Sequence, residues 1–346
     1  MSRRFTLLFS LCGLLLLLVC CQQTPYQEES GTVFHTLYHI KYQAPRPLTD
    51  SIDAELQAFN LSLNPFIPQS IISKVNHNEP VEVDDWFAEV FRTAEKVSAQ
   101  TEGAFDITCA PLVNLWGFGF QKMDSVTPQM VDSIRHFVGY RKMRLEGRRV
   151  VKEDERMMLN CSAIAKGYAC DVVARLLERN GVQNYMVEIG GEVTMRGVNA
   201  AGQGWRIGIN KPEDETEGVH NDIEEIVQLN KAGAIATSGN YRNFYIKEGK
   251  KYAHTIDPRT GYPAEQQILS ATIVADHCIT ADAYATAFMT LGLERVRALA
   301  PTIPDIEYYL IYVDEAGRHR IEYSEGMKPF LRTASTPGKG VGQVAP

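Results

Sequence analysis

Reactive side chains crowd into the stretch 252–263, whose letters read YAHTIDPRTGYP. An imidazole (His254), a carboxylate (Asp257), a guanidinium (Arg259) and a hydroxyl (Thr260) fall between positions 254 and 260. Two prolines and a glycine in the same stretch restrict or bend the backbone, which is typical of a tight turn. A strand that ended in a simple turn would not need so many reactive groups, so we interpret the stretch as the rim of a catalytic pocket.

A second candidate site lies on the alanine-rich segment 280–291, which we predict to be a helix ending at Gly292. Asp282 and Thr286 are four residues apart, so their side chains share one helix face. A carboxylate and a hydroxyl suit Mg²⁺, which takes its remaining oxygens from carbonyls, water and phosphates. The same pair is also typical of a capping interaction near a helix start, and the spacing leaves both interpretations open.

A third candidate site combines Ser162 at a predicted helix start with Lys166 one turn later. Free N–H groups at a helix start favour an anion, and the ammonium adds a charge that suits phosphate. The glycine spacing of a Walker loop is missing, so the pattern is not a P-loop. A surface lysine that follows a capping serine is the alternative interpretation.

Glycines next to polar or aromatic residues mark further turns. In segments 101–108 and 111–119 the aromatic residues alternate with glycines, which suits either the wall of a planar ligand site or core packing around irregular backbone. Gly190-Gly191 directly follows a predicted strand, which indicates that another segment or a ligand approaches the backbone closely. The segment 237–242 is a polar turn of the same kind.

The elements that must position these residues are of mixed type. Apolar spacing and capping residues predict helices at 49–62, 84–101, 163–180 and 280–291, and another helix that starts at Thr127-Pro128. Alternating or apolar runs predict strands at 31–42, 185–189, 192–198, 205–210, 225–229, 234–237, 241–246, 251–255, 269–275, 308–313 and 319–323, with hairpin turns at 247–250 and 315–317. Because helices and strands do not alternate in a regular βαβ rhythm, the fold class we expect is α+β.

The ends of the chain differ from the rest. Residues 1–21 combine an early basic pair, an apolar run at 5–19 and Cys20-Cys21, which predicts an export signal with a lipid-modified cysteine. Either cysteine could carry the lipid, and we favour Cys21. Residues 22–29 are expected to be a polar tether and residues 333–346 a loose tail.

Composition excludes one class of partner. The formal net charge is −7 and the chain has no basic cluster, which argues against nucleic acid. Cys109, Cys161, Cys170 and Cys278 lack the spacing of a metal site, so we expect buried thiols, although an exported location would permit a disulfide.

The motifs, taken in order, resemble the ApbE-like family of FAD:protein FMN transferases, which are exported and often lipid-anchored. The resemblance covers roughly residues 31–331. It rests on seven blocks: Gly31-Thr32; 103–108 with 111–117; 165–168 with Asp171; Gly190-Gly191; 238–241; 254–263; and 281–283 with Thr286. It implies a single large T-fold-related domain at 30–332, with mixed or antiparallel sheets and packed helices.

The resemblance also implies a ligand set. Mg²⁺ would be held by the side chains of Asp282 and Thr286 and by the carbonyl of Ala163. Ala285 stands where some members have a further carboxylate, and would offer its carbonyl. FAD would contact Ser30, Ala104, Phe105, Asp106, Asn160, Lys166 and Ile256; Asn160 departs from the aspartate that members more often have.

The implied reaction is transfer of the FMN moiety of FAD to a threonine, or sometimes serine, hydroxyl of an acceptor protein, with AMP leaving. The acceptor hydroxyl needs a base, for which His254 is the first choice and Asp257 the second. Two other activities stay open: an FAD pyrophosphatase that forms FMN and AMP, and a lipoprotein that binds FAD without catalysis. The implied partners are flavoprotein subunits of membrane redox complexes. The implied location is the periplasmic face of a bacterial membrane, reached through the N-terminal lipid.

Overall fold

The computed structural model describes residues 24–119, 125–212, 222–240, 244–247, 250–264 and 267–332. The predicted signal at 1–21 and the predicted tail at 333–346 lie outside these ranges. Within them, no helix has both the length and the apolar composition needed to cross a bilayer.

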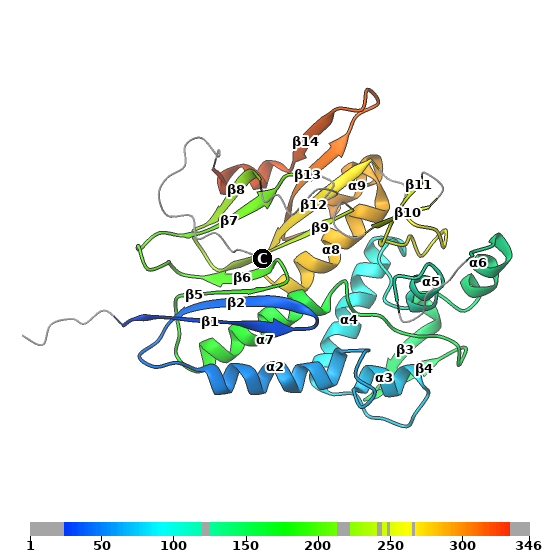
Figure 1. Cartoon of the computed structure of the whole chain (residues 1–346), viewed down its shortest axis with the longest axis horizontal. Coiled ribbons are helices and arrows are strands. Elements are labelled where there is room, and N and C mark those ends of the chain that lie inside the picture. Colours follow the sequence, from blue (N-terminus) through cyan, green and yellow to red (C-terminus); the bar gives the residue numbers. More distant parts are fainter. Residues whose placement is uncertain are drawn as a thin grey trace, which may run out of the picture.

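One antiparallel sheet organises the fold (Figure 1). Its eight strands, in sheet order, are β1 (Tyr26–Val33), β2 (Thr36–Gln43), β5 (Tyr185–Ile189), β6 (Glu192–Arg196), β9 (Gly233–Gly239), β12 (Ile268–Ala275), β13 (Ile306–Val313) and β14 (His319–Tyr323). Every neighbouring pair in this order is antiparallel. The predicted α+β class with antiparallel sheets is therefore confirmed.

Helices pack on one face of this sheet, while α5 and α6 lie beyond its edge. The helices of the described residues are α2 (Thr49–Leu63), α3 (Ile71–Asn76), α4 (Asp85–Gln100), α5 (Ala110–Leu115), α6 (Pro128–Arg135), α7 (Ala165–Arg179), α8 (Cys278–Leu291) and α9 (Leu293–Leu299). α8 packs against β9 and β12, and α7 packs against β5 and β6. α2 packs on α7, and α4 packs on α8, so α7 and α8 lie between the sheet and the outer helices.

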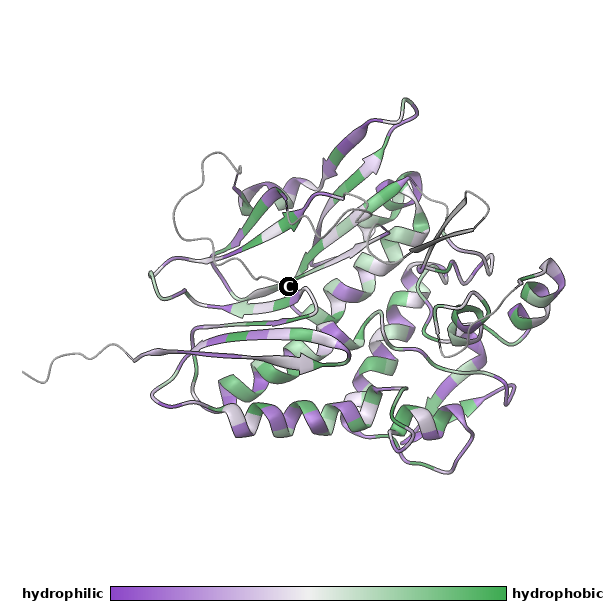
Figure 2. Cartoon of the chain, viewed as in Figure 1, coloured by the Kyte–Doolittle hydropathy of each residue, from purple (hydrophilic) through white to green (hydrophobic). Residues whose placement is uncertain are grey.

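The other face of the sheet is covered by a smaller sheet of β15 (Leu331–Arg332), β8 (Ile223–Leu229) and β7 (Trp205–Asn210). A second core fills the space between the two sheets, with Val193 and Met195 of β6 packed against Trp205 and Val227. The outer strand β14 is largely hydrophilic (Figure 2) and its residues are mostly exposed. The sheet thus separates a large helical core from a smaller core on its other side.

The remaining elements are short. They are the strand pairs β3 (Met143–Glu146) with β4 (Arg149–Lys152) and β10 (Phe244–Lys247) with β11 (Lys250–Ala253), and the 3₁₀ turns at Tyr140–Lys142, Ala300–Thr302 and Glu325–Phe330. The β10 and β11 pairing joins Lys247 to Lys250, which confirms the hairpin predicted there. The sequence analysis missed α3, α5, α9 and β3 to β4, because these elements are too short to show a clear period.

The main error of the sequence analysis concerns the first strand. In place of one strand at 31–42, the chain forms a hairpin in which Val33 pairs with Thr36. Phe34 and His35 form its two-residue turn, with φ of 53° and 60°. Such turns normally contain Asn or Gly, so Phe34 and His35 carry no recognisable signal of a hairpin turn. Because β1 begins at Tyr26, residues 26–29 of the predicted tether belong to the sheet.

The cysteines behave as predicted. Cys109, Cys161, Cys170 and Cys278 are free thiols, and all except the half-buried Cys109 are buried. Burial raises the pKa of each of these thiols, which keeps them protonated and unreactive.

Candidate active site

The predicted metal residues lie on α8, whose start is fixed by a carboxylate from α7. Asp171 accepts hydrogen bonds from the backbone N–H groups of Cys278 (3.0 Å) and Ile279 (2.9 Å), and from the hydroxyl of Thr194 on β6 (2.8 Å). The carboxylate therefore satisfies N–H groups that a helix start leaves without partners. This cap ties α7, α8 and β6 together at one point.

Asp282 lies one turn into α8 and faces α7. Asp282 is 3 % exposed, and its Oδ2 accepts a 2.9 Å hydrogen bond from the backbone N–H of Gly167. A Cβ at Gly167 would lie 2.4 Å from the carbonyl oxygen of Cys278 and 2.7 Å from Cβ of Asp282. The two helices can therefore approach this closely because position 167 has no side chain.

Lys166, the residue before Gly167, forms an ion pair with Glu192. Its Nζ lies 2.5 Å from Oε1 of Glu192, and the two side chains are 30 % and 5 % exposed. Burial opposes the charge on Lys166, but the carboxylates of Glu192 and Asp282 outweigh it and raise the lysine pKa. Burial in turn raises the pKa values of Glu192 and Asp282, and Lys166 opposes both shifts. The three groups form one interacting cluster of charges.

Four-residue spacing continues along α8 from Asp282 to Thr286 and Thr290, so these residues lie about 6 Å apart on one face. The Thr286 hydroxyl lies 3.1 Å from the hydroxyl of Ser238 on β9. The Thr290 hydroxyl donates to the carbonyl of Ala104 at 2.7 Å. This face of α8 therefore contacts in turn α7, the central sheet and the 101–108 segment.

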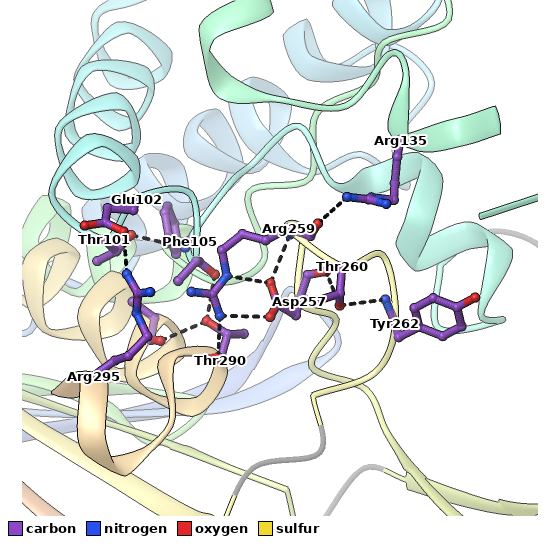
Figure 3. Close-up of polar contacts among 12 residues, drawn as sticks. Thr101, Glu102, Phe105, Arg135, Asp257, Arg259, Thr260, Tyr262, Thr290 and Arg295 are labelled. Carbon is purple, nitrogen blue, oxygen red and sulfur yellow. Dashed lines mark hydrogen bonds and ion pairs between the residues drawn. The ribbon is translucent and has the colours of Figure 1, made fainter. Parts of the chain in front are cut away.

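The 254–263 segment is attached to the same helix face through Arg259. Its guanidinium donates to both carboxylate oxygens of Asp257, at 2.9 Å and 2.8 Å, and to the backbone carbonyl of Thr290 at 2.8 Å (Figure 3). Arg135 on α6 donates to the carbonyl of Arg259 at 2.7 Å. The segment is thus fixed to the C-terminal end of α8 on one side and to α6 on the other.

His254 and Ile256 occupy different surroundings within this segment. The His254 ring is half-buried and meets the ring of Phe118 edge to face, with centroids 6.4 Å apart. Ile256 is 5 % exposed and belongs to a small apolar cluster with Leu112 and Trp116. Trp116 also donates to the carbonyl of Gly261 at 2.8 Å. The aromatic residues at 111–119 therefore support this segment by packing.

Asp106 and Asn160 both stabilise turns. Asp106 is buried and accepts backbone hydrogen bonds from Thr108 and Tyr140, each at 2.7 Å. Burial raises its pKa, although these hydrogen bonds oppose the shift. Asn160 accepts from the N–H of Ser162 at 2.8 Å and donates through its own N–H to Ile107 at 2.8 Å. An asparagine side chain makes this turn without a charge, which explains how the chain tolerates Asn160 here.

The structure brings together some of the predicted site residues around α8. Asp282 and Thr286 lie on α8, and Lys166 lies on the neighbouring α7. Ala104 is joined to α8 by the hydrogen bond from Thr290, and Asp257 is joined to it through Arg259. Ala104 and Phe105 are buried, so any contact of theirs with a ligand involves the backbone at their turn. Ser30 is exposed on β1, opposite His39, and His39 in turn lies opposite Glu188 on β5. Ser30 therefore lies two strands away from β5.

The donors present are compatible with Mg²⁺, although they do not form a typical metal cluster. In the described part of the chain, no group of three or more His, Cys, Asp or Glu side chains gathers as a metal site. Mg²⁺, however, needs only one or two protein carboxylates and takes its other oxygens from carbonyls, water and phosphate. Asp282 and Thr286 supply a carboxylate and a hydroxyl one turn apart, while the buried Ala285 and half-buried Ala163 could offer only backbone carbonyls.

The sequence analysis missed Glu192 as part of the site. Its one signal was the glycine pair directly before it, which indicated a close approach of another segment. Two segments approach there, because a Cβ at Gly190 would lie 3.0 Å from Cγ2 of Thr36 on β2 and 3.2 Å from Cδ of Lys166. The structure also gives Asp171 the role of a helix cap, which its place in a matched block did not reveal.

Known proteins resemble this chain along most of its length. The model of the ApbE family matches residues 34–310. A FAD:protein FMN transferase of Vibrio cholerae is 36 % identical over 336 residues, covering 94 % of this chain and 98 % of the relative. One from Haemophilus influenzae is 35 % identical and covers 86 % of this chain and 90 % of the relative.

Solved structures agree with these sequence matches. The flavin transferase ApbE from Vibrio cholerae superposes with a TM-score of 0.78 at 35 % identity, covering 89 % of this chain and 99 % of that chain. The apo flavinyl transferase ApbE from Pseudomonas stutzeri gives a TM-score of 0.78 at 28 % identity, covering 90 % of this chain and 98 % of that chain. The family expected from the sequence motifs is confirmed: this chain belongs to the ApbE family.

Proposed function

We propose that this protein transfers the FMN moiety of FAD to a threonine or serine hydroxyl of an acceptor protein, with Mg²⁺ as cofactor. The relatives named above are FAD:protein FMN transferases and cover nearly the whole chain. The observation that carries the proposal is the face of α8 on which Asp282, Thr286 and Thr290 follow one another. It joins the Asp282 carboxylate, which contacts Gly167 next to Lys166, to the central sheet and to the 254–263 segment.

The reaction exchanges one phosphorus–oxygen bond for another. The acceptor hydroxyl oxygen attacks the phosphorus on the FMN side of the pyrophosphate, and the bond from that phosphorus to the bridging oxygen breaks. AMP leaves with the bridging oxygen, and the hydroxyl proton passes to a base. In such reactions positioning and charge neutralisation provide most of the rate.

The residues of this chain divide these tasks. Asp282 and Thr286 would hold Mg²⁺ together with the carbonyls of Ala163 and Ala285, and the cation would supply charge neutralisation at the pyrophosphate. Lys166 adds a second positive charge beside the phosphates. We expect the turns at 104–106 and 160, together with Ser30 and Ile256, to contact the rest of FAD.

His254 is the proposed base. Its ring is half-buried and close to Phe118, so it has solvent access on one side, where an acceptor side chain could approach. Both oxygens of Asp257 already accept from Arg259, which favours a role for Asp257 in holding the segment. Asp257 remains the second candidate base.

The proposed setting is the outer face of a membrane. An export signal at 1–21 with a lipid on Cys20 or Cys21 would hold the domain at the bilayer surface, and the periplasmic face is the location we propose. The proposed acceptors are flavoprotein subunits of membrane redox complexes, because the anchor confines enzyme and acceptor to one surface.

A labelling experiment tests the proposed function. The purified protein is incubated with FAD, Mg²⁺ and a candidate acceptor, and covalent flavin is detected by fluorescence on a denaturing gel, with an EDTA-treated sample as control. We expect labelled acceptor with Mg²⁺ and none with EDTA. Free FMN and AMP without labelling would indicate a pyrophosphatase, whereas unchanged bound FAD would indicate a carrier.

A further inference from the structure

The two side chains of the Lys166–Glu192 ion pair differ strongly in their exposure to solvent. The lysine side chain is 30 % exposed, while the glutamate side chain is 5 % exposed. Oε1 of Glu192 is 2.5 Å from Nζ of Lys166, and within the described residues its buried Oε2 has no hydrogen-bond partner. The buried Glu192 carboxylate thus pairs with the Lys166 ammonium, while the lysine side chain stays partly exposed to solvent.

The backbone around Glu192 is shaped to hold this pair. Gly190 and Gly191 form the two-residue turn between β5 and β6, with φ of 66° and 99°, and Ile189 pairs with Glu192. Gly190 leaves room for both Thr36 and the lysine stem, because a Cβ there would lie 3.0 Å from Cγ2 of Thr36 and 3.2 Å from Cδ of Lys166. Cys170 on α7 donates through Sγ to the carbonyl of Glu192 at 3.2 Å. Glu192 is therefore fixed from both its strand and α7.

Stability alone does not account for a buried ion pair of this kind. Removing two charges from water costs free energy that their attraction often fails to recover, and an apolar pair of similar size is frequently as stable. The location of the pair gives a better reason. Lys166 interacts electrostatically with both Glu192 and Asp282, and Gly167, the next residue, donates directly to Asp282.

We propose that Glu192 is a positioning residue that holds the Lys166 ammonium away from Asp282, so that this carboxylate stays available to the divalent cation. With Glu192 present, the partly exposed Lys166 ammonium has its charge balanced without Asp282. Without Glu192, the ammonium pairs with Asp282 and competes with the cation. This inference rests on the metal assignment of the proposed function.

Direct cation binding tests the inference. Isothermal titration of the full protein with Mg²⁺ in the absence of FAD measures affinity without any turnover. Glu192→Gln should weaken Mg²⁺ binding by about 10- to 100-fold, the effect typical of residues that support metal ligands. The double variant Glu192→Gln with Lys166→Met should regain most of the lost affinity, because the competing ammonium is gone.

Two further variants separate positioning from folding. Glu188→Gln is the matched control: it removes a partly buried carboxylate on β5 that acts electrostatically on Lys166 but accepts its hydrogen bond from Gly191, and it should leave Mg²⁺ affinity within about 3-fold of wild type. Lys166→Met alone should bind Mg²⁺ at least as tightly as wild type but should weaken the quenching of flavin fluorescence by FAD binding. This single variant tests the inference even if Glu192→Gln fails to fold.

The outcomes are distinct. Wild-type affinity in Glu192→Gln, or a double variant no tighter than Glu192→Gln, would overturn the role of Glu192 and leave the metal assignment standing. An equal loss in Glu188→Gln would show a general effect of negative charge and would also overturn it. If the wild-type protein itself binds no Mg²⁺, both this inference and the proposed metal site are wrong.

Discussion

The backbone N–H of Gly167 donates a 2.9 Å hydrogen bond to the carboxylate of Asp282, and it joins two helices that are far apart in sequence. The contact fixes how the carboxylate is oriented before any cation binds. It also fixes the backbone next to Lys166, the preceding residue, whose ammonium pairs with Glu192. The geometry of the proposed metal site therefore depends on a position with no side chain.

Gly167→Ala should disrupt this crossing. The added methyl group would lie 2.4 Å from the carbonyl oxygen of Cys278, a backbone atom that cannot move aside cheaply. We expect the free energy of unfolding to fall by about 1–3 kcal/mol, as is usual for overpacking, and Mg²⁺ binding to weaken. Denaturant unfolding and titration calorimetry measure the two effects. Gly233→Ala is the control, because a Cβ there has ordinary contacts at 3.4 Å and 3.5 Å; an equal loss in both variants would contradict the account.

Asp282→Ala should abolish Mg²⁺-dependent flavin transfer. Residues that merely support metal ligands are worth about 10- to 100-fold, so the loss of a ligand should exceed roughly 100-fold in rate. A matched control is Asp276→Asn, which neutralises an exposed carboxylate just before α8 and should leave the rate unchanged. Initial rates of acceptor labelling at saturating FAD measure the effect, and a wild-type rate in Asp282→Ala would refute the metal assignment.

Arg259→Lys should loosen the 254–263 segment although the charge is kept. A lysine cannot donate to both oxygens of Asp257 and also to the carbonyl of Thr290, as the planar guanidinium does. Because hydrogen bonds to charged groups contribute about 1.5–3 kcal/mol each, we expect a loss of stability of about that size and a lower transfer rate at unchanged Mg²⁺ affinity. Thermal unfolding and labelling rates test this. The control Arg295→Lys alters an exposed ion pair with Glu102 and should change neither.

The sequence predicts features that depend on neighbouring residues better than features that depend on contacts between distant segments of the chain. The α8 site was predictable because Asp282 and Thr286 are local neighbours on a helix. The pair of Lys166 and Glu192 was not, because it depends on how α7 packs against the β5 to β6 turn. The hairpin at Phe34 and His35 was missed for a different reason, since bulky residues adopt a turn conformation that usually belongs to glycine or asparagine.

The same distinction applies to the 254–263 segment. Its density of reactive groups led to its interpretation as the rim of a catalytic pocket, which stays a prediction, and the structure joins the segment to α8 through Arg259 and Thr290. Sequence alone could not separate the tasks of Asp257 and His254, because both are polar residues of one turn. The hydrogen bonds from Arg259 to both oxygens of Asp257 indicate a structural role for Asp257, while the role of His254 remains a prediction.

The contact between α4 and α7 gives a pH-dependent prediction. Glu89 accepts from Arg175 at 2.6 Å and 3.0 Å and from the hydroxyl of Tyr168 at 2.5 Å. The hydrogen bonds from Arg175 lower the pKa of Glu89, despite partial burial. The ionised carboxylate thus stabilises the fold above its unfolded pKa of about 4.3, and this contribution is lost as the pH falls through the lower folded value.

Glu89→Gln should therefore lower the stability at neutral pH but not in acid. Both partners are more than a third exposed, so after solvent screening the difference should be about 1 kcal/mol. Urea unfolding of wild type and variant at pH 7 and at decreasing pH below 4 measures it. The exposed Glu95 on the same helix gives the control Glu95→Gln. A gap between wild type and Glu89→Gln that stays constant down to acid pH would contradict the assignment.

The role of His254 is the central chemical claim about the transfer step. His254→Ala should bind FAD and Mg²⁺ like the wild type but transfer flavin about 10²- to 10⁴-fold more slowly, the usual contribution of a general base. Asp257→Asn, which keeps a side chain of the same shape, should reduce transfer less and lower stability more.

The most direct measurement is a single-turnover experiment in which FAD is bound to excess enzyme with Mg²⁺ and then mixed with acceptor. AMP release and covalent flavin on the acceptor are followed together by chromatography and mass spectrometry. We predict that wild-type protein yields AMP and covalent flavin in a one-to-one ratio, with the flavin on a threonine or serine, and that His254→Ala yields neither on the same timescale. Covalent flavin formed by His254→Ala at the wild-type rate, or AMP released by wild type without covalent flavin, would contradict the account.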